Sequence, residues 1–353
     1  MPIDHAQPFT IGVTRDVRNA DGSLTFVPTA DLAALEIAGV EWAFLAEDAR
    51  PLTPELLHGI DGLYHFSPPL TAASLDDAVG DRLVIVARHG VGLDFIDVDA
   101  CTERGIVVTI TPAGVTRPMA SAAAALVLSL AHRLRERDDA FHRGDWAAGR
   151  FQPTGMGLSG RTLGVVGYGR IGREIVRLLE PWQMRVLVSQ RTPVAEPDVT
   201  YVPLDTLLAE SDVVVLACPL TPETRGMLDD RRLRLLKPTA FLVNVARGGL
   251  VHQAALVDAL RNGRLAGAGV DVVDPEPLPA DDPLLELPNV VGAPHSLGYT
   301  DELVRGCVGG VCSALLDVAA GRTPADVVNP DVLDSTLFLE KVARLEARRG
   351  GTR

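Results

Sequence analysis

The feature that most constrains the fold is a glycine-rich stretch, VVGYGRIG, which follows an apolar run and precedes a helical pattern. In such a strand-to-helix turn, Gly167 permits a tight bend and Gly169 lets the backbone approach a pyrophosphate. Gly172 lets the helix pack closely on the strand. The first helical turn, with Arg170 and Ile171, adds unpaired N–H groups that attract an anion. The stretch predicts a dinucleotide-binding βαβ unit rather than a purely structural turn.

The end of the next predicted strand bears on which dinucleotide binds. An NAD site usually has an acidic residue about 20 positions after its glycines, where it accepts hydrogen bonds from ribose hydroxyls. Here the strand ends in Ser189, Gln190 and Arg191. Glutamine does not repel a 2′-phosphate, and an arginine fork binds phosphate well. The sequence favours NADP(H) over NAD(H), although an arginine that only points into solvent would leave the same pattern.

The pattern of the whole chain indicates a doubly wound α/β fold with parallel sheets, because short apolar runs alternate with helical segments. In the first third, the predicted strands cover 9–14, 61–67, 82–88 and 106–111, and the predicted helices cover 30–39, 52–60 and 71–80. Six buried strands are predicted later, at 163–169, 184–190, 212–219, 240–246, 266–273 and 289–295. The helices predicted between them cover 171–180, 203–211, 230–236 and 253–263.

Three further segments connect or close these elements. The Ala-rich segment 117–146 predicts one long helix that begins at Pro118 and faces both the other domain and a dimer partner. The segment 300–321 predicts a closing helix that returns to pack on the first domain. The Arg-rich residues 340–353 predict a solvated, frayed tail.

The composition restricts the classes of partner that the protein can bind and the cell compartment in which it is expected. With 353 residues and a net charge of −13, the chain can form two domains and disfavours non-specific binding to nucleic acid or anionic membranes. The cysteines, at 101, 218, 307 and 312, form no CxxC pair and no Cys/His set at zinc spacing, which predicts free thiols and no metal site. No signal-peptide pattern and no uninterrupted apolar run of membrane length is present, so a cytoplasmic location is expected.

Three of the later predicted strands are each followed by one polar residue: Arg247, Glu276 and His295. Doubly wound sheets bind ligands at the carboxyl ends of their strands. Arginine can hold a carboxylate and polarise the adjacent carbonyl oxygen, and histidine can exchange a proton with that oxygen. A carboxylate bonded to the imidazole would orient it and favour its protonated form. Taken one at a time, each residue also fits a purely structural role: Arg247 as a helix-capping arginine, Glu276 as a turn residue and His295 as a loop histidine. Together they predict hydride transfer at a carbonyl carbon that bears a carboxylate.

Over nearly its full length the chain resembles the D-isomer-specific 2-hydroxyacid dehydrogenase family. The resemblance rests on RHGVGLDFIDVDACTERGIVVTITPAG, LSGRTLGVVGYGRIG, CPLTPETRGML, NVARGGLV, VDVVDPEPLP and APHSLG, in that order. It implies a Rossmann-type nucleotide domain and a discontinuous, flavodoxin-like substrate domain with the active site in the cleft between them. It also implies a homodimer built around the nucleotide domains.

The resemblance assigns roles to single residues. Arg247, Glu276 and His295 match the catalytic residues, with spacings of 29 and 19 residues that also fit. Asp271 matches the residue that holds the nicotinamide carboxamide. The positions that match the wall of the cofactor site are Cys218, Pro219, Thr224 and Val245.

Substrate contacts are expected from the first domain as well as from Arg247 and His295. The backbone of Val91 and Gly92 matches the loop that grips the substrate carboxylate. The segment 64–70 contains no arginine or lysine, which counts against phosphoglycerate. The phosphite-oxidising branch of the family has a lysine where this chain has Val91, and the formate branch has a glutamine where this chain has Glu276. These differences count against both branches. Whether His89 lines the pocket or is simply a loop residue stays open.

These observations predict a substrate domain at 1–113, completed by 299–353, and an NAD(P)-binding Rossmann domain at 114–298. The expected activity is NADP(H)-dependent reduction of a small 2-oxoacid to the D-2-hydroxyacid, with glyoxylate, hydroxypyruvate or a specialised oxoacid of a biosynthetic pathway as candidates. The alternative is an NAD(P)-sensing interaction protein like the corepressors related to this family. Those proteins keep the same three catalytic residues, so turnover of a 2-oxoacid is what separates the two hypotheses.

Overall fold

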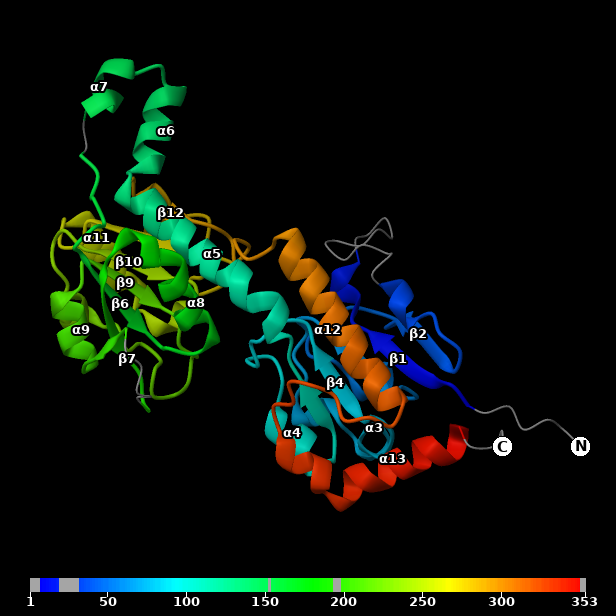
Figure 1. Ribbon diagram of the computed structural model, residues 1–353. Helices are drawn as coiled ribbons and strands as arrows, with labels where there is room; N and C mark the ends of the chain where they lie inside the picture. Colours follow the sequence, from blue (N-terminus) through cyan, green and yellow to red (C-terminus); the bar gives the residue numbers. More distant parts are fainter. Residues whose placement is uncertain (1–6, 19–31, 152–153, 193–197, 350–353) are drawn as a thin grey trace, which may run out of the picture. The chain divides into compact units, whose positions relative to one another are not determined.

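The computed structural model describes residues 7–18, 32–151, 154–192 and 198–349 (Figure 1). The chain divides into two compact units: unit 1 is Met1–Val115 with Thr300–Arg353, and unit 2 is Thr116–Tyr299. Each unit has its own parallel sheet, which confirms the predicted fold of two parallel-sheet α/β domains. The first two residues of the helix predicted at 30–39 and the last four of the predicted tail lie outside the described residues.

Unit 1 is built on five parallel strands in the order β2-β1-β3-β4-β5. The strands are β1 (Phe9–Val13), β2 (Val40–Phe44), β3 (Gly62–His65), β4 (Ile85–Arg88) and β5 (Val107–Thr109). Four of them match predicted strands. The sequence does not predict β2, because VEWAF at the sheet edge alternates exposed and half-buried residues instead of forming a continuous apolar run.

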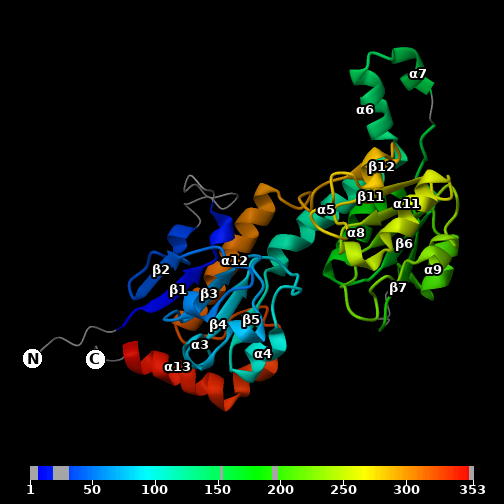
Figure 2. The ribbon, with the colours of Figure 1, turned by 180° about the vertical axis from the view of Figure 1, so that it is seen from behind.

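Two helical layers cover the two faces of this sheet. The short helices are η1 (Arg15–Val17), η2 (Ala33–Leu35), α2 (Pro54–Leu57), η3 (Ala72–Ser74), α3 (Asp77–Arg82), α4 (Val98–Glu103) and η7 (Pro330–Asp334). On one face lies the closing helix α12 (Asp301–Ala319) (Figures 1 and 2). Its Val308, Val311 and Leu315 share one apolar cluster with residues of β1 and β4. The prediction that this helix returns to the first domain is confirmed. On the other face, residues of α2, α3 and α4 form a second apolar cluster.

The predicted frayed tail is wrong for the described residues, because α13 (Thr336–Arg349) is a helix anchored in unit 1. Phe338 and Leu345 are buried in the apolar core. The ammonium of Lys341 is also buried and donates to the carbonyl oxygens of Leu83, Arg104 and Gly105. Of the arginines that suggest a solvated tail, Arg344 is exposed, whereas Arg348 is half-buried and donates to the buried carboxylate of Asp61.

Unit 2 holds seven parallel strands in the order β12-β11-β10-β9-β6-β7-β8. The strands are β6 (Thr162–Val166), β7 (Arg185–Ser189), β8 (Thr200–Tyr201), β9 (Val213–Leu216), β10 (Phe241–Asn244), β11 (Gly267–Val270) and β12 (Val290–Gly292). All except the two-residue β8 match predicted strands. Most are buried on both faces, which explains their continuous apolar sequences.

The helices of unit 2 divide between the two faces of its sheet. They are α5 (Pro112–Ala131), which begins in unit 1, α6 (Leu134–His142), α7 (Trp146–Phe151), α8 (Arg170–Leu179), η4 (Glu180–Trp182), α9 (Leu204–Glu210), α10 (Asp230–Leu233), η5 (Gly248–Leu250), α11 (Gln253–Arg261) and η6 (Pro283–Glu286). Residues of α5 and α8 share one apolar cluster with β6 and β9, and residues of α9, α10 and α11 share another with β9 and β10.

The single long helix predicted at 117–146 is wrong. The first helix begins earlier, at Pro112, and Pro118 lies inside it. The chain then breaks at Arg133, whose backbone adopts the left-handed conformation with φ of 54°, and α6 begins at the next residue. By length and composition α5 could cross a membrane, but half of the apolar window is buried inside the protein, as in the core helix of a globular domain.

Lys341 provides a test of how α13 is held. Burial lowers the pKa of Lys341 to about 8, so the three-donor ammonium is the main form at pH 7. Replacing it in Lys341→Met leaves three carbonyl oxygens without their donor, and we expect the free energy of unfolding of unit 1 to fall by about 3 kcal/mol in urea titrations. The control is Arg344→Met, on the same helix, whose exposed guanidinium donates to the oxygen of Asp81. A control effect as large as that of Lys341→Met would contradict the assignment.

Candidate active site

The glycine stretch forms the turn between β6 and α8. Gly167 has φ of 93°, and a Cβ atom there would lie 2.7 Å from backbone atoms of Cys218, so neither the conformation nor the space admits another residue. Gly169 is the N-cap of α8, and no atom of the described residues lies within 4 Å of the position of its missing Cβ. Arg170 is exposed, Ile171 is half-buried and Gly172 is buried. The open N-terminus of α8 therefore fits the phosphates of a dinucleotide.

The residues after β7 reach back to this turn. The side-chain oxygen of Gln190 accepts a hydrogen bond from the backbone N–H of Tyr168 at 3.2 Å, and its amide nitrogen donates to the oxygen of Thr192 at 2.8 Å. Arg191 is exposed. A hydrogen bond from Thr221 lowers the pKa of Glu223, and the positive charge of Arg191 adds to this effect. The side chains of Arg191 and Glu223 therefore lie close enough for their charges to interact.

The segment after β9 forms a wall beside the glycine turn. Burial raises the pKa of the Cys218 thiol to about 11, so the thiol stays protonated at neutral pH. Pro219 is exposed, and its oxygen accepts a hydrogen bond from the hydroxyl of Thr224 at 2.9 Å. Val245, after β10, is buried. The predicted wall residues thus supply packing surfaces, and the thiol of Cys218 is poorly suited to nucleophilic chemistry.

Asp271, directly after β11, carries a buried oxygen with no hydrogen-bond partner among the described residues. Its side chain is 1% exposed, and one carboxylate oxygen accepts from the backbone N–H groups of Ser296 and Leu297 at 2.8 and 3.0 Å. The other oxygen, Oδ2, is the one left unpaired. A buried acceptor needs a donor, so this site fits an amide N–H such as that of a nicotinamide carboxamide.

His295 and Glu276 form a hydrogen-bonded pair. Nδ1 of His295 lies 2.9 Å from Oε2 of Glu276, and Oε1 of Glu276 accepts from the backbone N–H of Val273 at 3.1 Å. The backbone of His295 is left-handed, with φ of 54°, and its N–H donates to the oxygen of Asp271 at 2.8 Å. The two side chains are 47% and 38% exposed, so Nε2 of the imidazole is left for proton exchange with a ligand.

Burial opposes the ionisation of Glu276, yet its pKa lies below its usual range. The hydrogen bond and the positive charge offered by His295 outweigh burial, with help from the N–H of Val273 and the charge of Arg247. Glu276 is therefore a carboxylate at neutral pH.

Arg247 lies at the N-terminal boundary of η5 in extended conformation, with φ of −148°. Its guanidinium donates to the oxygen of Ala246 at 2.7 Å, and its charge reaches Glu276. The side chain of Asn244, at the end of β10, donates to the oxygen of Arg247 at 2.9 Å and accepts from the N–H of Ala246 at 3.1 Å. Asn244 does not stand out in the sequence, and the one signal for it is a polar residue at the end of an apolar strand.

In unit 1, the predicted carboxylate loop follows β4. Val91 and Gly92 are half-buried, and the oxygen of Gly92 accepts from Nε of Arg88 at 3.0 Å. His89 is buried, and its Nδ1 lies 2.8 Å from the hydroxyl of Tyr64. Burial lowers the pKa of His89 to about 3, so this histidine is neutral at physiological pH and unsuited to act as a cationic anchor.

Comparisons with known proteins show which family the chain resembles. Residues 124–296 match the family model for the D-isomer specific 2-hydroxyacid dehydrogenase, NAD binding domain. Glyoxylate reductase of Thermococcus onnurineus is 40% identical over 302 residues, which is 83% of this chain and 90% of that protein. Glyoxylate reductase of Thermococcus litoralis is 41% identical over 264 residues, or 72% of this chain and 80% of that protein.

Solved structures show the same similarity. The NADPH-dependent glyoxylate/hydroxypyruvate reductase of Sinorhizobium meliloti, in complex with NADP and malonate, has 31% identity and a TM-score of 0.79. The match covers 91% of this chain and 97% of that one.

The unpaired oxygen of Asp271 leads to a binding prediction. Asp271→Asn keeps the oxygen that accepts from Ser296 and Leu297 but replaces Oδ2 with a donor. We expect the Kd of a reduced nicotinamide dinucleotide to rise about tenfold in fluorescence titrations, or about 1.4 kcal/mol. Asp212→Asn is the control, since Asp212 is also buried but lies at the amino end of β9 and accepts from the N–H of Thr162. Equal losses in both variants would sink the assignment.

Proposed function

Because the chain belongs to the D-isomer-specific 2-hydroxyacid dehydrogenase family, we propose that it reduces a small 2-oxoacid to the D-2-hydroxyacid and prefers NADP(H) to NAD(H). As a member, it is an NAD(P)-dependent D-2-hydroxyacid dehydrogenase. Glyoxylate and hydroxypyruvate are the candidate substrates, since relatives are glyoxylate reductases and one is a glyoxylate/hydroxypyruvate reductase. The observation that carries the proposal is the His295–Glu276 pair with the charge of Arg247 beside it.

In the proposed mechanism, His295 is the proton donor. Its Nδ1 is held by Glu276, so Nε2 carries the proton that the carbonyl oxygen of the substrate takes up as it becomes a hydroxyl. The negative charge of Glu276 favours the protonated imidazole before the transfer. Arg247 binds the substrate carboxylate and stabilises the negative charge that develops on the carbonyl oxygen.

The dinucleotide is held by unit 2 in this proposal. The turn at Gly167 and Gly169 binds the pyrophosphate at the N-terminus of α8, and Asp271 accepts from the carboxamide. When bound, the nicotinamide supplies a hydride to the carbonyl carbon. Unit 2 is thus the proposed nucleotide domain and unit 1 the substrate domain, in which the backbone of Val91 and Gly92 binds the substrate carboxylate.

The preference for NADP(H) rests on the residues after β7. Gln190 is uncharged and is held toward the glycine turn, and the exposed guanidinium of Arg191 can bind a 2′-phosphate. The NADPH-dependent Sinorhizobium meliloti relative supports this choice. Glu223 opposes it, because its carboxylate competes with phosphate for the charge of Arg191.

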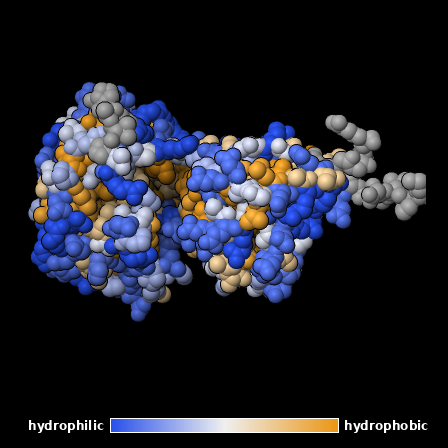
Figure 3. Space-filling view, turned by 90° about the horizontal axis from the view of Figure 1, so that it is seen from below, coloured by the Kyte–Doolittle hydropathy of each residue, from blue (hydrophilic) through white to orange (hydrophobic). Residues whose placement is uncertain are grey.

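We also propose a cytoplasmic homodimer. All four cysteines are free thiols, as a reducing compartment favours. Hydrophilic residues cover most of the face shown in Figure 3, with smaller apolar patches between them. By contrast, α6 and α7 expose four large apolar side chains, each more than half accessible: Leu134, Phe141, Trp146 and Phe151. An exposed group of this kind is typical of a surface that another chain covers, and a second copy is the occupant we propose.

The cofactor proposal is tested by titrating the protein with NADPH and with NADH. We expect NADPH to bind at least about tenfold more tightly, and Arg191→Ala to remove the difference. Glu223→Gln should tighten NADPH binding and leave NADH binding unchanged, because it removes the competing carboxylate. If NADH binds as well as NADPH, the preference fails and Arg191 is a surface residue.

The catalytic proposal is tested with the pH dependence of oxoacid reduction. We expect His295→Asn to lower kcat about 10²- to 10⁴-fold while the Kd of the dinucleotide changes little. Reduction requires the protonated imidazole, so kcat/KM declines as pH rises. In Glu276→Gln the imidazole loses its anionic neighbour, so the decline should begin at a lower pH. Unchanged turnover in His295→Asn, or nucleotide binding without turnover in the wild type, would refute the mechanism.

A further inference from the structure

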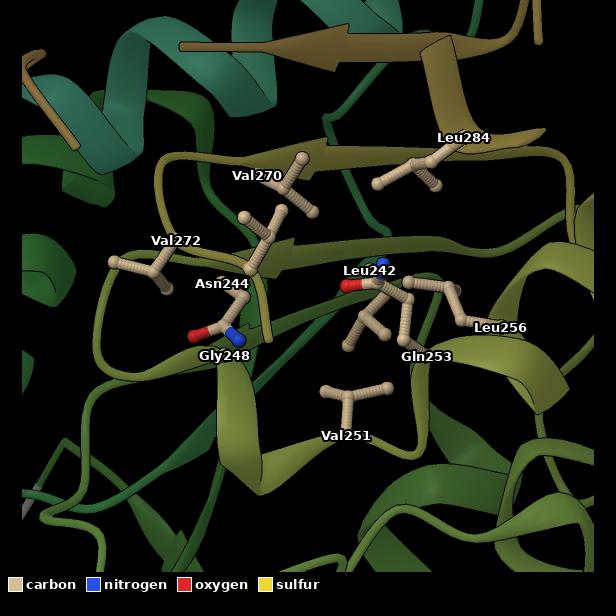
Figure 4. Close-up of a pocket in the computed structure, with 10 residues that line it drawn as sticks. Leu242, Asn244, Gly248, Val251, Gln253, Leu256, Val270, Val272 and Leu284 are labelled. Atoms are coloured by element: carbon tan, nitrogen blue, oxygen red, sulfur yellow. The ribbon is translucent and has the colours of Figure 1, made fainter. Parts of the chain in front are cut away.

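Behind the loop that carries Arg247 lies a small pocket, with room for about one water molecule. Most of its wall is apolar, from side chains of β10, β11, α11 and η6. Two amide side chains, of Asn244 and Gln253, stand among them (Figure 4). Neither belongs to the proposed catalytic residues, so the role of the buried amide of Asn244 and the half-buried amide of Gln253 needs an explanation.

The loops that carry Arg247 and Glu276 contact each other at this pocket. A Cβ atom at Gly248 would lie 1.9 Å from the carbonyl oxygen of Val273, so the two backbones are in direct contact. The N–H of Val273 in turn donates to Glu276. A shift of the 271–282 loop would therefore move the carboxylate of Glu276 relative to both Arg247 and His295.

Gln253, the first residue of α11, holds that loop at two points. Its side-chain oxygen accepts from the backbone N–H of Asp274 at 3.1 Å, and its amide nitrogen donates to Oδ2 of Asp282 at 2.8 Å. The other oxygen of Asp282 accepts from the N–H of Leu284 and caps η6. Only a side chain with both an acceptor and a donor can make these bonds, and a carboxylate at 253 would face the carboxylate of Asp282.

We propose that Gln253 is a positioning residue for the reaction, which holds the 271–282 loop so that Glu276 stays aligned with Nδ1 of His295. This inference rests on the proposed function, because it presumes that the Glu276–His295 pair transfers the proton. Gln253 touches no reacting atom and acts only through the backbone of Asp274 and the side chain of Asp282.

The first test replaces the amide with an apolar side chain of similar length. In Gln253→Met we expect kcat for oxoacid reduction to fall about tenfold to a hundredfold, and the decline of kcat/KM with rising pH to begin at a lower pH, as in Glu276→Gln. The Kd of the dinucleotide should change less than threefold. Asn262→Leu is the matched control: Asn262 is the C-cap of α11, and among the described residues its side-chain amide donates only to Asp258. Its replacement should weaken the end of the helix without reaching the loop. It should leave the pH profile in place.

The second test reverses the donor and the acceptor of the hydrogen bond between residues 253 and 282. It tests the positioning role even if Gln253→Met fails to fold. Asp282→Asn alone should lower kcat, because the asparagine amide cannot both accept from Gln253 and cap η6 well. In Gln253→Glu with Asp282→Asn, the glutamate accepts from Asp274 and from the asparagine amide, whose oxygen still caps Leu284. We expect the double variant to recover at least half of the lost kcat and the wild-type pH profile.

The outcomes separate the two proposals. If Glu276→Gln moves the pH profile but Gln253→Met does not, or if the double variant recovers nothing, the positioning role is wrong and the catalytic proposal stands. If Glu276→Gln leaves the profile unchanged as well, the role of Glu276 is wrong and the positioning role falls with it.

Discussion

The parallel pairing of β10, β11 and β12 is the constraint on which the candidate site depends. Its register sets Phe241 beside Gly267 and Ala268 beside Val290, so the three strands end at one edge of the sheet. The loops that carry Arg247, Asp271, Glu276 and His295 leave from that edge. Backbone hydrogen bonds then hold the strand ends together. The N–H of Asp271 donates to the carbonyl oxygen of Asn244, and the N–H of His295 donates to the carbonyl oxygen of Asp271. Residues far apart in sequence become neighbours because the backbone, rather than their side chains, fixes the distances.

Much of the fold could be predicted from the sequence, and the failures have physical causes. Buried parallel strands need continuous apolar runs, and for that reason segments of six to eight residues sufficed to predict nearly all of the strands. The edge strand β2 lacks this pattern because its residues are only partly covered. The break at Arg133 depends on a single left-handed residue that carries no glycine or proline signal. Lys341 resembles a solvated charge in sequence, and only the tertiary fold reveals the three carbonyl groups that surround it.

For the candidate site, the sequence predicts the proposed catalytic residues better than the residues that hold them. Arg247, Glu276 and His295 stand out because charged or titratable groups follow apolar strands. Asn244 and Gln253 do not stand out, because a single amide in an apolar segment carries no information about its partners. Their hydrogen bonds run mostly to backbone groups, whose positions appear only once the loops are folded. The sequence also says nothing of Glu223, since 32 residues separate it from Arg191.

The exposure of the His295–Glu276 pair to solvent limits the free energy that its hydrogen bond contributes in the absence of a ligand. With the side chains 47% and 38% exposed, water screens the attraction between the charges, and a pair of this kind contributes little free energy to folding. A ligand that displaces water from His295 lowers the local dielectric constant and strengthens the same attraction. That gain is realised only if the carboxylate is already aligned when the ligand arrives, because realignment would consume binding energy. A loop held by backbone contact at Gly248 and by a side-chain bond from Gln253 meets this requirement without placing another charge near the reacting atoms.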